Sequence, residues 1–291
     1  KIDEDGNMLG IREGTTWVKV KDKKTGKESV AIIRVVDNNI EYNTHVAPNA
    51  VSGKNYALGL KEDGTIWTWG YDASGLADSN VPVSTNVIST YNSISAGKNY
   101  ALATRKDGTA WAIGSNNYGQ LGIGSYESKA KLVQIEGLTD ITSISAGETH
   151  SIALDSYGTV YGWGSNANGE LSSKYTGKDT SKPVVISMPR DTIIQISAGK
   201  AESAFVTTNG QVYGMGKILN GYIPGVTNAV KVEVGTNYLL ILRADGTIYK
   251  YQDGQLTQVS NIKNAIDISV QNNVNMYQSV DEKAYTWGEN I

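Results

Sequence analysis

Short runs of alternating apolar and polar residues follow one another along most of the chain, separated by turns that contain Gly, Asn or Asp. Residues 151–154 (Ser-Ile-Ala-Leu), for example, lead through a turn to residues 159–163 (Thr-Val-Tyr-Gly-Trp). Such alternation is typical of half-buried strands. Asp-Gly or Asn-Gly between two runs indicates a β-hairpin, because glycine adopts a positive φ without steric cost. The pattern therefore predicts an all-β chain built from hairpins.

The hairpins recur as six copies of one repeat. In five copies a first glycine is followed eleven residues later by a turn glycine, at positions 53 and 64, 97 and 108, 147 and 158, 199 and 210, and 235 and 246. In the sixth copy Gln271 and Glu282 take these two positions. One hairpin cannot bury its own faces, whereas sheets arranged around an axis bury theirs against neighbours. We therefore expect a β-propeller, with Ala-Gly pairs such as Ala146-Gly147 where strands crowd near the axis.

The motif within these copies resembles the repeat of the regulator of chromosome condensation family. Residues 114–122 (Gly-Ser-Asn-Asn-Tyr-Gly-Gln-Leu-Gly) and 164–171 match its second half closely, and the resemblance covers roughly residues 45–291, about 85% of the chain. The other copies depart from the motif there, so we expect reduced loops after Gly216 and Tyr251. The resemblance implies seven blades. Because six copies are visible, we expect a seventh beyond the C-terminal end of this sequence.

Residues 1–40 follow a different pattern. Strand-like stretches at 14–20 and 31–36 flank a charged tip at 21–28, and further short stretches precede them at 2–6 and 8–10. Their order resembles the second half of a bacterial immunoglobulin-like domain of the second group, a type of domain stacked in the stalks of surface proteins. We therefore expect a partial immunoglobulin-like domain at 1–40, a connector at 41–49, and a propeller domain that spans 41–291 and includes that connector.

Composition narrows the chemistry. The chain has 26 Lys and Arg against 29 Asp and Glu, a net charge of −3, which argues against nucleic acid as the main partner. No apolar run reaches the roughly 18 residues of a membrane span. The absence of Cys excludes disulfides, thiolate catalysis and Cys-bound zinc. Tyr outnumbers Phe 17 to 1, which suits half-buried sites and contact surfaces.

No set of nucleophile, base and orienting residue is visible. Asp63, Asp107 and Asp245 precede turn glycines, so we interpret them as turn formers rather than catalytic carboxylates. His45 lies in the connector, and His150 takes a repeat position that holds Tyr in other copies. We therefore expect no enzyme activity, no cofactor and no metal site.

The residues after the first glycine of each copy are the candidate binding residues. They are rich in Tyr, Asn and Lys, and Tyr supplies large contact area at low entropic cost. The alternative is that these Tyr side chains pack against the adjacent blade. The candidate partner-binding residues are Lys54, Asn55, Tyr56, Lys98, Asn99, Tyr100, Asn117, Tyr118, His150, Asn237 and Tyr238.

The resemblance implies binding without catalysis. Exchange factors of the family need a basic tail and a wedge insertion, and its ultraviolet sensors need clustered Trp in a motif missing here. A bacterial relative that inhibits β-lactamases binds through aromatic residues in similar turns. We expect an extracellular or surface-displayed bacterial interaction or adhesion module, whose partner is a protein or cell-surface ligand. The alternatives are a structural spacer that packs against copies of itself and, more weakly, a glycan-binding module.

Overall fold

The computed structural model describes residues 14–21, 28–35, 49–72, 75–85, 91–172, 176–188, 191–271 and 273–288. Every regular element in these residues is a β-strand, which confirms the predicted all-β class. The chain divides into two units, Lys1–Thr44 and His45–Ile291. This division lies inside the predicted connector at 41–49.

The first unit contains one antiparallel hairpin. Strand β1 (Gly14–Lys21) pairs with β2 (Glu28–Val35), with Gly14 opposite Val35 and Lys21 opposite Glu28. Both predicted strands are present, and the second begins three residues earlier than its pattern indicated. The stretches predicted at 2–6 and 8–10, and the interior of the charged tip, lie outside the described residues.

The second unit is a six-bladed propeller of antiparallel sheets. In each blade the strands are paired in chain order. Blade 1 comprises β3 (Asn49–Ser52), β4 (Tyr56–Leu60), β5 (Ile66–Tyr71) and β6 (Asp78–Ser84). Blade 2 comprises β7 (Tyr91–Ala96), β8 (Tyr100–Arg105), β9 (Ala110–Gly114) and β10 (Lys129–Gln134). Blade 3 comprises β11 (Ile141–Ala146), β12 (His150–Asp155), β13 (Val160–Gly164) and β14 (Thr180–Val185).

The remaining three blades continue this order with shorter outer parts. Blade 4 comprises β15 (Ile193–Ala198), β16 (Glu202–Thr207), β17 (Val212–Gly216) and β18 (Asn220–Tyr222). Blade 5 comprises β19 (Ala229–Val234), β20 (Leu239–Arg243), β21 (Ile248–Gln252) and β22 (Gln255–Gln258). Blade 6 has three strands in the described residues, β23 (Ala265–Gln271), β24 (Val274–Ser279) and β25 (Ala284–Gly288).

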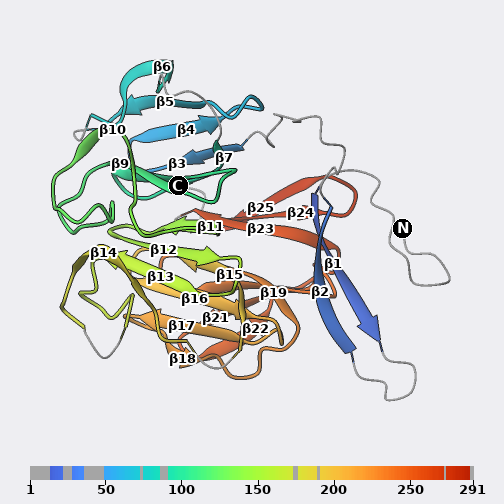
Figure 1. Ribbon diagram of the computed structural model, residues 1–291. Coiled ribbons are helices and arrows are strands. Elements are labelled where there is room, and N and C mark those ends of the chain that lie inside the picture. Colours follow the sequence, from blue (N-terminus) through green and yellow to red (C-terminus); the bar gives the residue numbers. More distant parts are fainter. Residues whose placement is uncertain are drawn as a thin grey trace. The chain divides into compact units, whose positions relative to one another are not determined.

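The first strands of successive blades lie side by side, from β3 through β7, β11, β15 and β19 to β23. The blades follow one another from blue to red in Figure 1. Gln271 on the last of these strands donates a hydrogen bond from Nε2 to the Ser52 carbonyl oxygen at 3.4 Å. Residues 219 positions apart thus meet, and blade 6 returns to blade 1.

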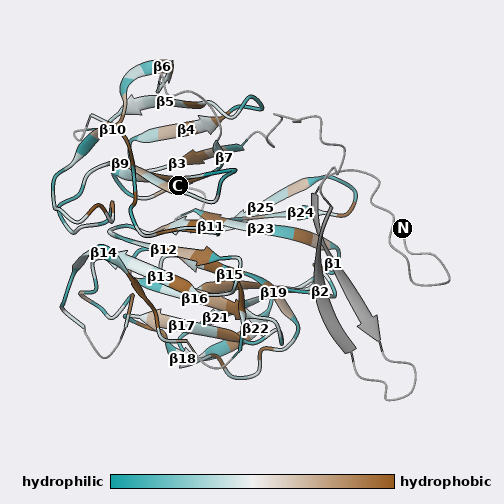
Figure 2. Cartoon of the chain, viewed as in Figure 1, coloured by the Kyte–Doolittle hydropathy of each residue, from teal (hydrophilic) through white to brown (hydrophobic). Residues whose placement is uncertain are grey.

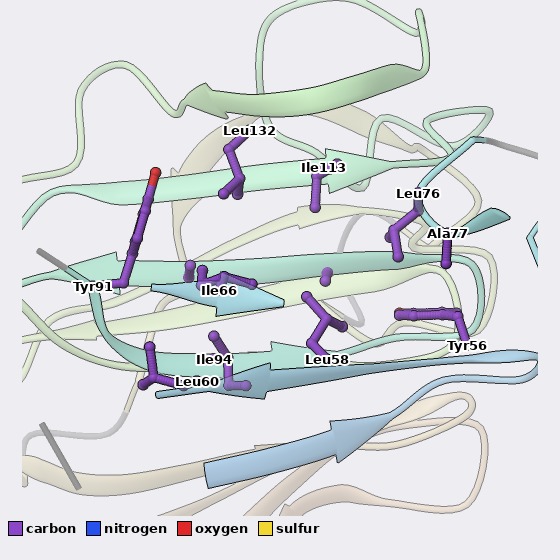
Figure 3. Packing of buried hydrophobic residues seen from close by; sticks show 12 residues of the cluster. Tyr56, Leu58, Leu60, Ile66, Leu76, Ala77, Tyr91, Ile94, Ile113 and Leu132 are labelled. Carbon is purple, nitrogen blue, oxygen red and sulfur yellow. The ribbon is translucent and has the colours of Figure 1, made fainter. Parts of the chain in front are cut away.

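The hydrophobic core lies between blades. All six residues of β12 and of β16 are buried, because each of these second strands is covered on both faces. Figure 3 shows the cluster between the first two blades, where Leu58 and Ile66 of blade 1 meet Ile94 and Ile113 of blade 2. Apolar residues are accordingly concentrated along the strands in Figure 2.

The Asp residues before the turn glycines form turns, as predicted. Asp63 Oδ1 accepts hydrogen bonds from Thr65 N at 2.9 Å and Thr65 Oγ1 at 2.5 Å, while Gly64 has a φ of 76°. Asp107 receives the same two bonds from Thr109 at 3.0 and 2.6 Å. These bonds from Thr65 and Thr109, the side-chain bond foremost, lower the pKa of the two carboxyls. Both side chains are therefore occupied within their own turns.

The first glycine of blades 1, 2 and 3 is required by the close approach of the next blade. A Cβ on Gly53 would lie 2.6 Å from the carbonyl oxygen of Gly97, and one on Gly97 would lie 2.6 Å from that of Gly147. The Gly97 Cβ would also overlap the ring of Tyr100, with Cε1 at 2.1 Å. Neither obstacle is the mobile end of a long side chain, so the overlap cannot be relieved without moving backbone. The predicted crowding near the axis is confirmed.

Gly97→Ala should therefore destabilise the propeller by about 1–3 kcal/mol, the range that overpacking commonly costs. Gly59→Ala is the matched control, because its Cβ would meet only the edge of Trp69, at 3.3 Å. Thermal denaturation followed by circular dichroism measures both variants. Equal melting temperatures for the two variants would contradict the close-approach explanation.

Candidate binding face at the mouth of the propeller

The propeller has two chemically different ends. The turns between the first and second strands lie at the same end of the propeller as the loops between the third and fourth strands. In blade 2, for example, Gly114 ends the third strand and pairs with Tyr100, which begins the second strand, and with Lys129, which begins the fourth. We call this end the mouth face. The turns between second and third strands form the opposite end, the Asp-Gly face, at residues 61–65, 105–109, 155–159, 207–211, 243–247 and 279–283.

Two-residue turns of one design surround the mouth. The amide of the first glycine donates to the carbonyl oxygen three residues later, at 2.9 Å from Gly53 to Tyr56 and at 2.8 Å from Gly97 to Tyr100. The same bond recurs in blades 3, 4 and 5 at 2.8–2.9 Å. The two residues between are left at the surface, and Lys54, Asn55 and Asn237 are exposed. These three predicted site residues therefore remain available to a partner.

The aromatic side chains that follow these turns point between the blades. Tyr56, Tyr100, His150 and Tyr238 are 0–4% exposed, so the solvent-facing ring of Tyr and His expected from the sequence is not formed. Figure 3 shows Tyr56 beside Leu76 and Ala77 in the core. The placement corresponds to the packing alternative. Its physical reason is that the position begins the second strand, which is covered on both faces.

Each of these buried side chains binds the next blade through its polar end. The Tyr56 hydroxyl donates to the Gly97 carbonyl oxygen at 2.9 Å. The Tyr100 hydroxyl donates to the His150 carbonyl oxygen and accepts a hydrogen bond from Ser151 Oγ at 3.0 Å. The Tyr238 hydroxyl donates to Asn275 Oδ1 at 2.6 Å. We call this position the latch, because one side chain fills the gap between two blades and satisfies a polar group across it.

His150 serves as the latch of blade 3 in a neutral form. Its Nε2 lies 3.0 Å from Ser203 Oγ of blade 4. Complete burial lowers the pKa of His150 to about 4, because the imidazolium would lose its hydration. A neutral ring suits a structural contact in the core. His150 is therefore not available to a partner, although the sequence placed it among the candidate binding residues.

Blade 4 departs from the pattern, since Glu202 takes the latch position and turns toward its own blade. Its carboxylate accepts hydrogen bonds from Ile218 N at 2.8 Å and Leu219 N at 3.2 Å. Burial raises the pKa of Glu202 to about 7, and the nearby Glu170 adds to the shift. The buried carboxylate thus fastens the short loop after Gly216, whose reduction the sequence predicted.

The loops on the mouth face are long in blades 2 and 3, at residues 115–128 and 165–179, and short in blades 4 and 5, at 217–219 and 253–254. A buried Asn holds the base of each long loop. Asn116 donates to the carbonyl oxygens of Ser125 and Glu127 at 2.8 and 3.1 Å, and its Oδ1 accepts the Leu121 amide at 2.9 Å. In blade 3, Asn166 donates to the Ser172 carbonyl oxygen at 3.1 Å, and its Oδ1 accepts the Leu171 amide at 2.9 Å.

The long loop of blade 2 carries two of the predicted site residues, Asn117 and Tyr118. Both are exposed, and Tyr118 is 45% accessible. They lie on the mouth face beyond the ring of turns. The long mouth-face loops therefore belong to blades 2 and 3, and the short ones belong to blades 4 and 5.

A cavity of about 370 Å³ opens at the centre of the mouth face. Main-chain atoms and small side chains line its wall, and the turns supply Lys54, Lys98, Glu148, Lys200, Thr236 and Gln271. Asn99 lies beside Lys98 and is half-buried. Glu148, Lys200 and Thr236 directly follow the first glycine, the repeat position that the sequence marked for binding, although they were not among the candidate residues named. Gln271 replaces the first glycine of the sixth copy and was not considered for binding.

Two kinds of site are missing from the described part of the chain. No group of three or more His, Cys, Asp or Glu residues is placed to hold a metal ion there. The same residues contain no helix that could cross a membrane.

Comparison with known proteins identifies the repeat. Two models of the regulator of chromosome condensation (RCC1) repeat match the chain, one at residues 107–154 and 157–206 and the other at 91–120 and 141–170. The chain therefore carries RCC1 repeats, as its motif indicated. These matches fall on blades 2 to 4. No curated protein matches the chain.

Solved structures share the fold at low sequence identity. Human WBSCR16 has a TM-score of 0.68 and 14% identity, over 76% of this chain and 69% of that one. Prp20p from Saccharomyces cerevisiae has a TM-score of 0.68 and 18% identity, over 77% of this chain and 66% of its own. The CRINKLY WD40 ectodomain of the Arabidopsis thaliana receptor kinase ACR4 has a TM-score of 0.58 and 17% identity, over 82% and 78%. This chain thus spans about two thirds of the length of the first two.

Tyr100→Phe should lower the free energy of unfolding by about 1–3 kcal/mol, because Ser151 and the His150 carbonyl lose a buried partner. Tyr118→Phe is the matched control, since that ring is exposed. Chemical denaturation at neutral pH measures both. A Tyr100 variant as stable as the Tyr118 variant would show that the latch hydroxyl contributes nothing.

Glu202 should make the propeller less stable as the pH rises. Its pKa is raised from 4.5 to about 7, so its contribution to stability is complete below pH 4.5 and is lost as the pH rises through 7. Glu202→Gln removes this dependence. Guanidinium denaturation measures the free energy of unfolding of both proteins. The difference between wild type and Glu202→Gln should be more favourable to wild type at pH 5 than at pH 8. The titration of His150 does not affect this difference, because both proteins contain it. An identical difference at the two pH values would contradict the assignment.

Proposed function

We propose that this chain is a non-catalytic protein-interaction module that binds its partner on the mouth face. The observation that carries the proposal is the ring of exposed turn residues around an open cavity. The long loops of blades 2 and 3 lie on the same face, and buried Asn side chains hold them in place. Rigid presentation of polar and aromatic groups lowers the entropic cost of binding. Of the expected site residues, Lys54, Asn55, Lys98, Asn99, Asn117, Tyr118 and Asn237 belong to this surface.

Similar propellers support a role in protein binding. The structure of Prp20p was described together with the binding of that protein to Gsp1p and histones. The same yeast protein, RCC1 (Prp20), was also crystallised bound to Kap60. It shares less than 25% identity with this chain, so it supports the class of function and leaves the partner open.

We further propose that the propeller is displayed outside a bacterial cell and acts in adhesion, following the partial immunoglobulin-like domain expected at 1–40. The hairpin of β1 and β2 fits the order of strands that this resemblance requires. A propeller in a receptor ectodomain, as in ACR4, is a precedent for extracellular use of the fold.

A structural role as a building block is the second candidate, and blade 6 favours it. Val274 and Met276 alternate with the buried Asn275 along β24, and they are 45% and 41% exposed, whereas β12 and β16 are buried on both faces. No described residue of the propeller covers this face of blade 6. Another copy of the chain packed against it would bury it.

The mouth-face proposal predicts that Asn55→Ala, Tyr118→Ala and Asn237→Ala together abolish partner binding without lowering the melting temperature. Truncation of a central interface Tyr commonly costs about 2 kcal/mol or more. Affinity capture of surface proteins by the immobilised full chain, quantified by mass spectrometry, measures the effect.

The matched control changes the Asp-Gly face instead, with Glu62→Ala, Lys106→Ala and Glu282→Ala. A protein retained by wild type and this control but lost by the mouth-face variant supports the proposal. Equal retention by all three proteins contradicts it, and so does loss in the control alone.

A further inference from the structure

The charges around the cavity are unevenly distributed. The first position of the turn holds Lys54, Lys98 and Lys200 in blades 1, 2 and 4, and Glu148 in blade 3. Blades 5 and 6 place the neutral Thr236 and Gln271 at the cavity. One side of the cavity is therefore cationic although the whole chain has a net charge of −3, and the other side offers a hydroxyl and an amide.

Glu148 joins two of the lysines. Its Oε1 contacts Lys98 Nζ, and its Oε2 lies 3.8 Å from Lys200 Nζ. The carboxylate is the least exposed of the three, with 22% of its side chain accessible against 39% for Lys98 and 65% for Lys200. Glu148 therefore holds both ammonium groups beside the cavity while leaving them open to solvent. Three lysines and one glutamate therefore leave an excess of positive charge around the cavity.

The wall of the cavity suits a narrow chain. Gly53, Gly97, Gly147, Gly199 and Gly235 line it together with Ala and Val residues. Its volume, about 370 Å³, falls in the range of roughly 300–1,000 Å³ in which ligand pockets are found. Backbone groups, Thr236 and Gln271 can hydrogen-bond to peptide groups, and the lysines can pair with carboxylates.

We propose that the cavity takes up a carboxylate-bearing segment of a polypeptide, with Lys54, Lys98 and Lys200 as the anion-binding groups. The inference rests on the proposed function and names the chemistry of the partner. On blades 4 and 5 the loops between the third and fourth strands are only three and two residues long, and no residue of these loops lines the cavity. Glu148 competes with the ligand's carboxylates for Lys98 and Lys200, so it weakens the binding of an acidic segment.

The residues around the cavity fit a peptide better than a nucleic acid. Binding of single-stranded nucleic acid combines a continuous cationic track with aromatic side chains on which bases stack. The lining residues include no aromatic side chain and no Arg.

Fluorescence anisotropy with a fluorescein-labelled hexaglutamate peptide tests the inference on the full chain. We expect saturable binding that weakens when NaCl is raised from about 50 to 300 mM, as screening requires. Lys54→Gln, Lys98→Gln and Lys200→Gln together should weaken binding at least about tenfold. Glu148→Gln should strengthen it several-fold, because a competing carboxylate is removed.

The control triple variant on the Asp-Gly end, Lys61→Gln, Lys106→Gln and Lys263→Gln, makes the same change in net charge and should leave binding unchanged. Equal weakening in both triple variants would overturn the inference, since it would show a response to overall charge alone. Equal binding of hexaglutamine, or tighter binding of a hexathymidine oligonucleotide, would overturn it as well. Weaker binding by Glu148→Gln would contradict the assigned role of that carboxylate.

Failure of this inference can be distinguished from failure of the proposed function. The capture experiment changes Asn55, Tyr118 and Asn237 and leaves the lysines in place. Suppose that wild type captures a partner, that the variant of Asn55, Tyr118 and Asn237 does not, and that hexaglutamate fails to bind wild type. The mouth face is then the interface, and only the inference of an acidic ligand segment is contradicted.

Discussion

The propeller depends on the close approach of neighbouring backbones around its axis. The space between Gly53 and the Gly97 carbonyl oxygen, and between Gly97 and that of Gly147, is too small for a Cβ. The same glycines accommodate the rings of the latch residues, since a Cβ on Gly97 would lie only 2.1 Å from Tyr100 Cε1. One residue choice thus sets the spacing of the blades and makes room for the side chain that joins them.

The latch explains why aromatic residues recur without forming a surface. A Tyr at the start of a second strand supplies apolar area and carries a hydroxyl that satisfies a polar group of the next blade, which a Phe cannot do. The residue across the interface is matched to it, since Tyr100 meets Ser151, His150 meets Ser203 and Tyr238 meets Asn275. Blade 4 differs, because its latch position holds Glu202, which bonds within its own blade.

The fold was accessible from sequence because the repeat has a fixed internal spacing. The distance between first and turn glycines determines the hairpins, and the Asp-Gly turns form as predicted. The direction of the latch side chains was not accessible in the same way. A Tyr after a polar turn has the same local pattern whether it faces solvent or the next blade, and only the packing of both faces of the second strand decides between them.

The candidate site was partly predictable for the same reason. Lys54, Asn55 and Asn237 lie in two-residue turns, where the hairpin geometry leaves them exposed. The shared role of Glu148 between Lys98 and Lys200 depends on blades 2, 3 and 4 meeting at the axis, and no local pattern contains that information.

Hydrogen–deuterium exchange of wild type and Tyr100→Phe tests most directly whether the latches couple successive blades. The account predicts faster exchange in β12 of blade 3 as well as in β8 of blade 2, because the Tyr100 hydroxyl bonds to His150 and Ser151 across the interface. Faster exchange confined to blade 2 would show that Tyr100 only fills space in its own blade, and it would contradict the account.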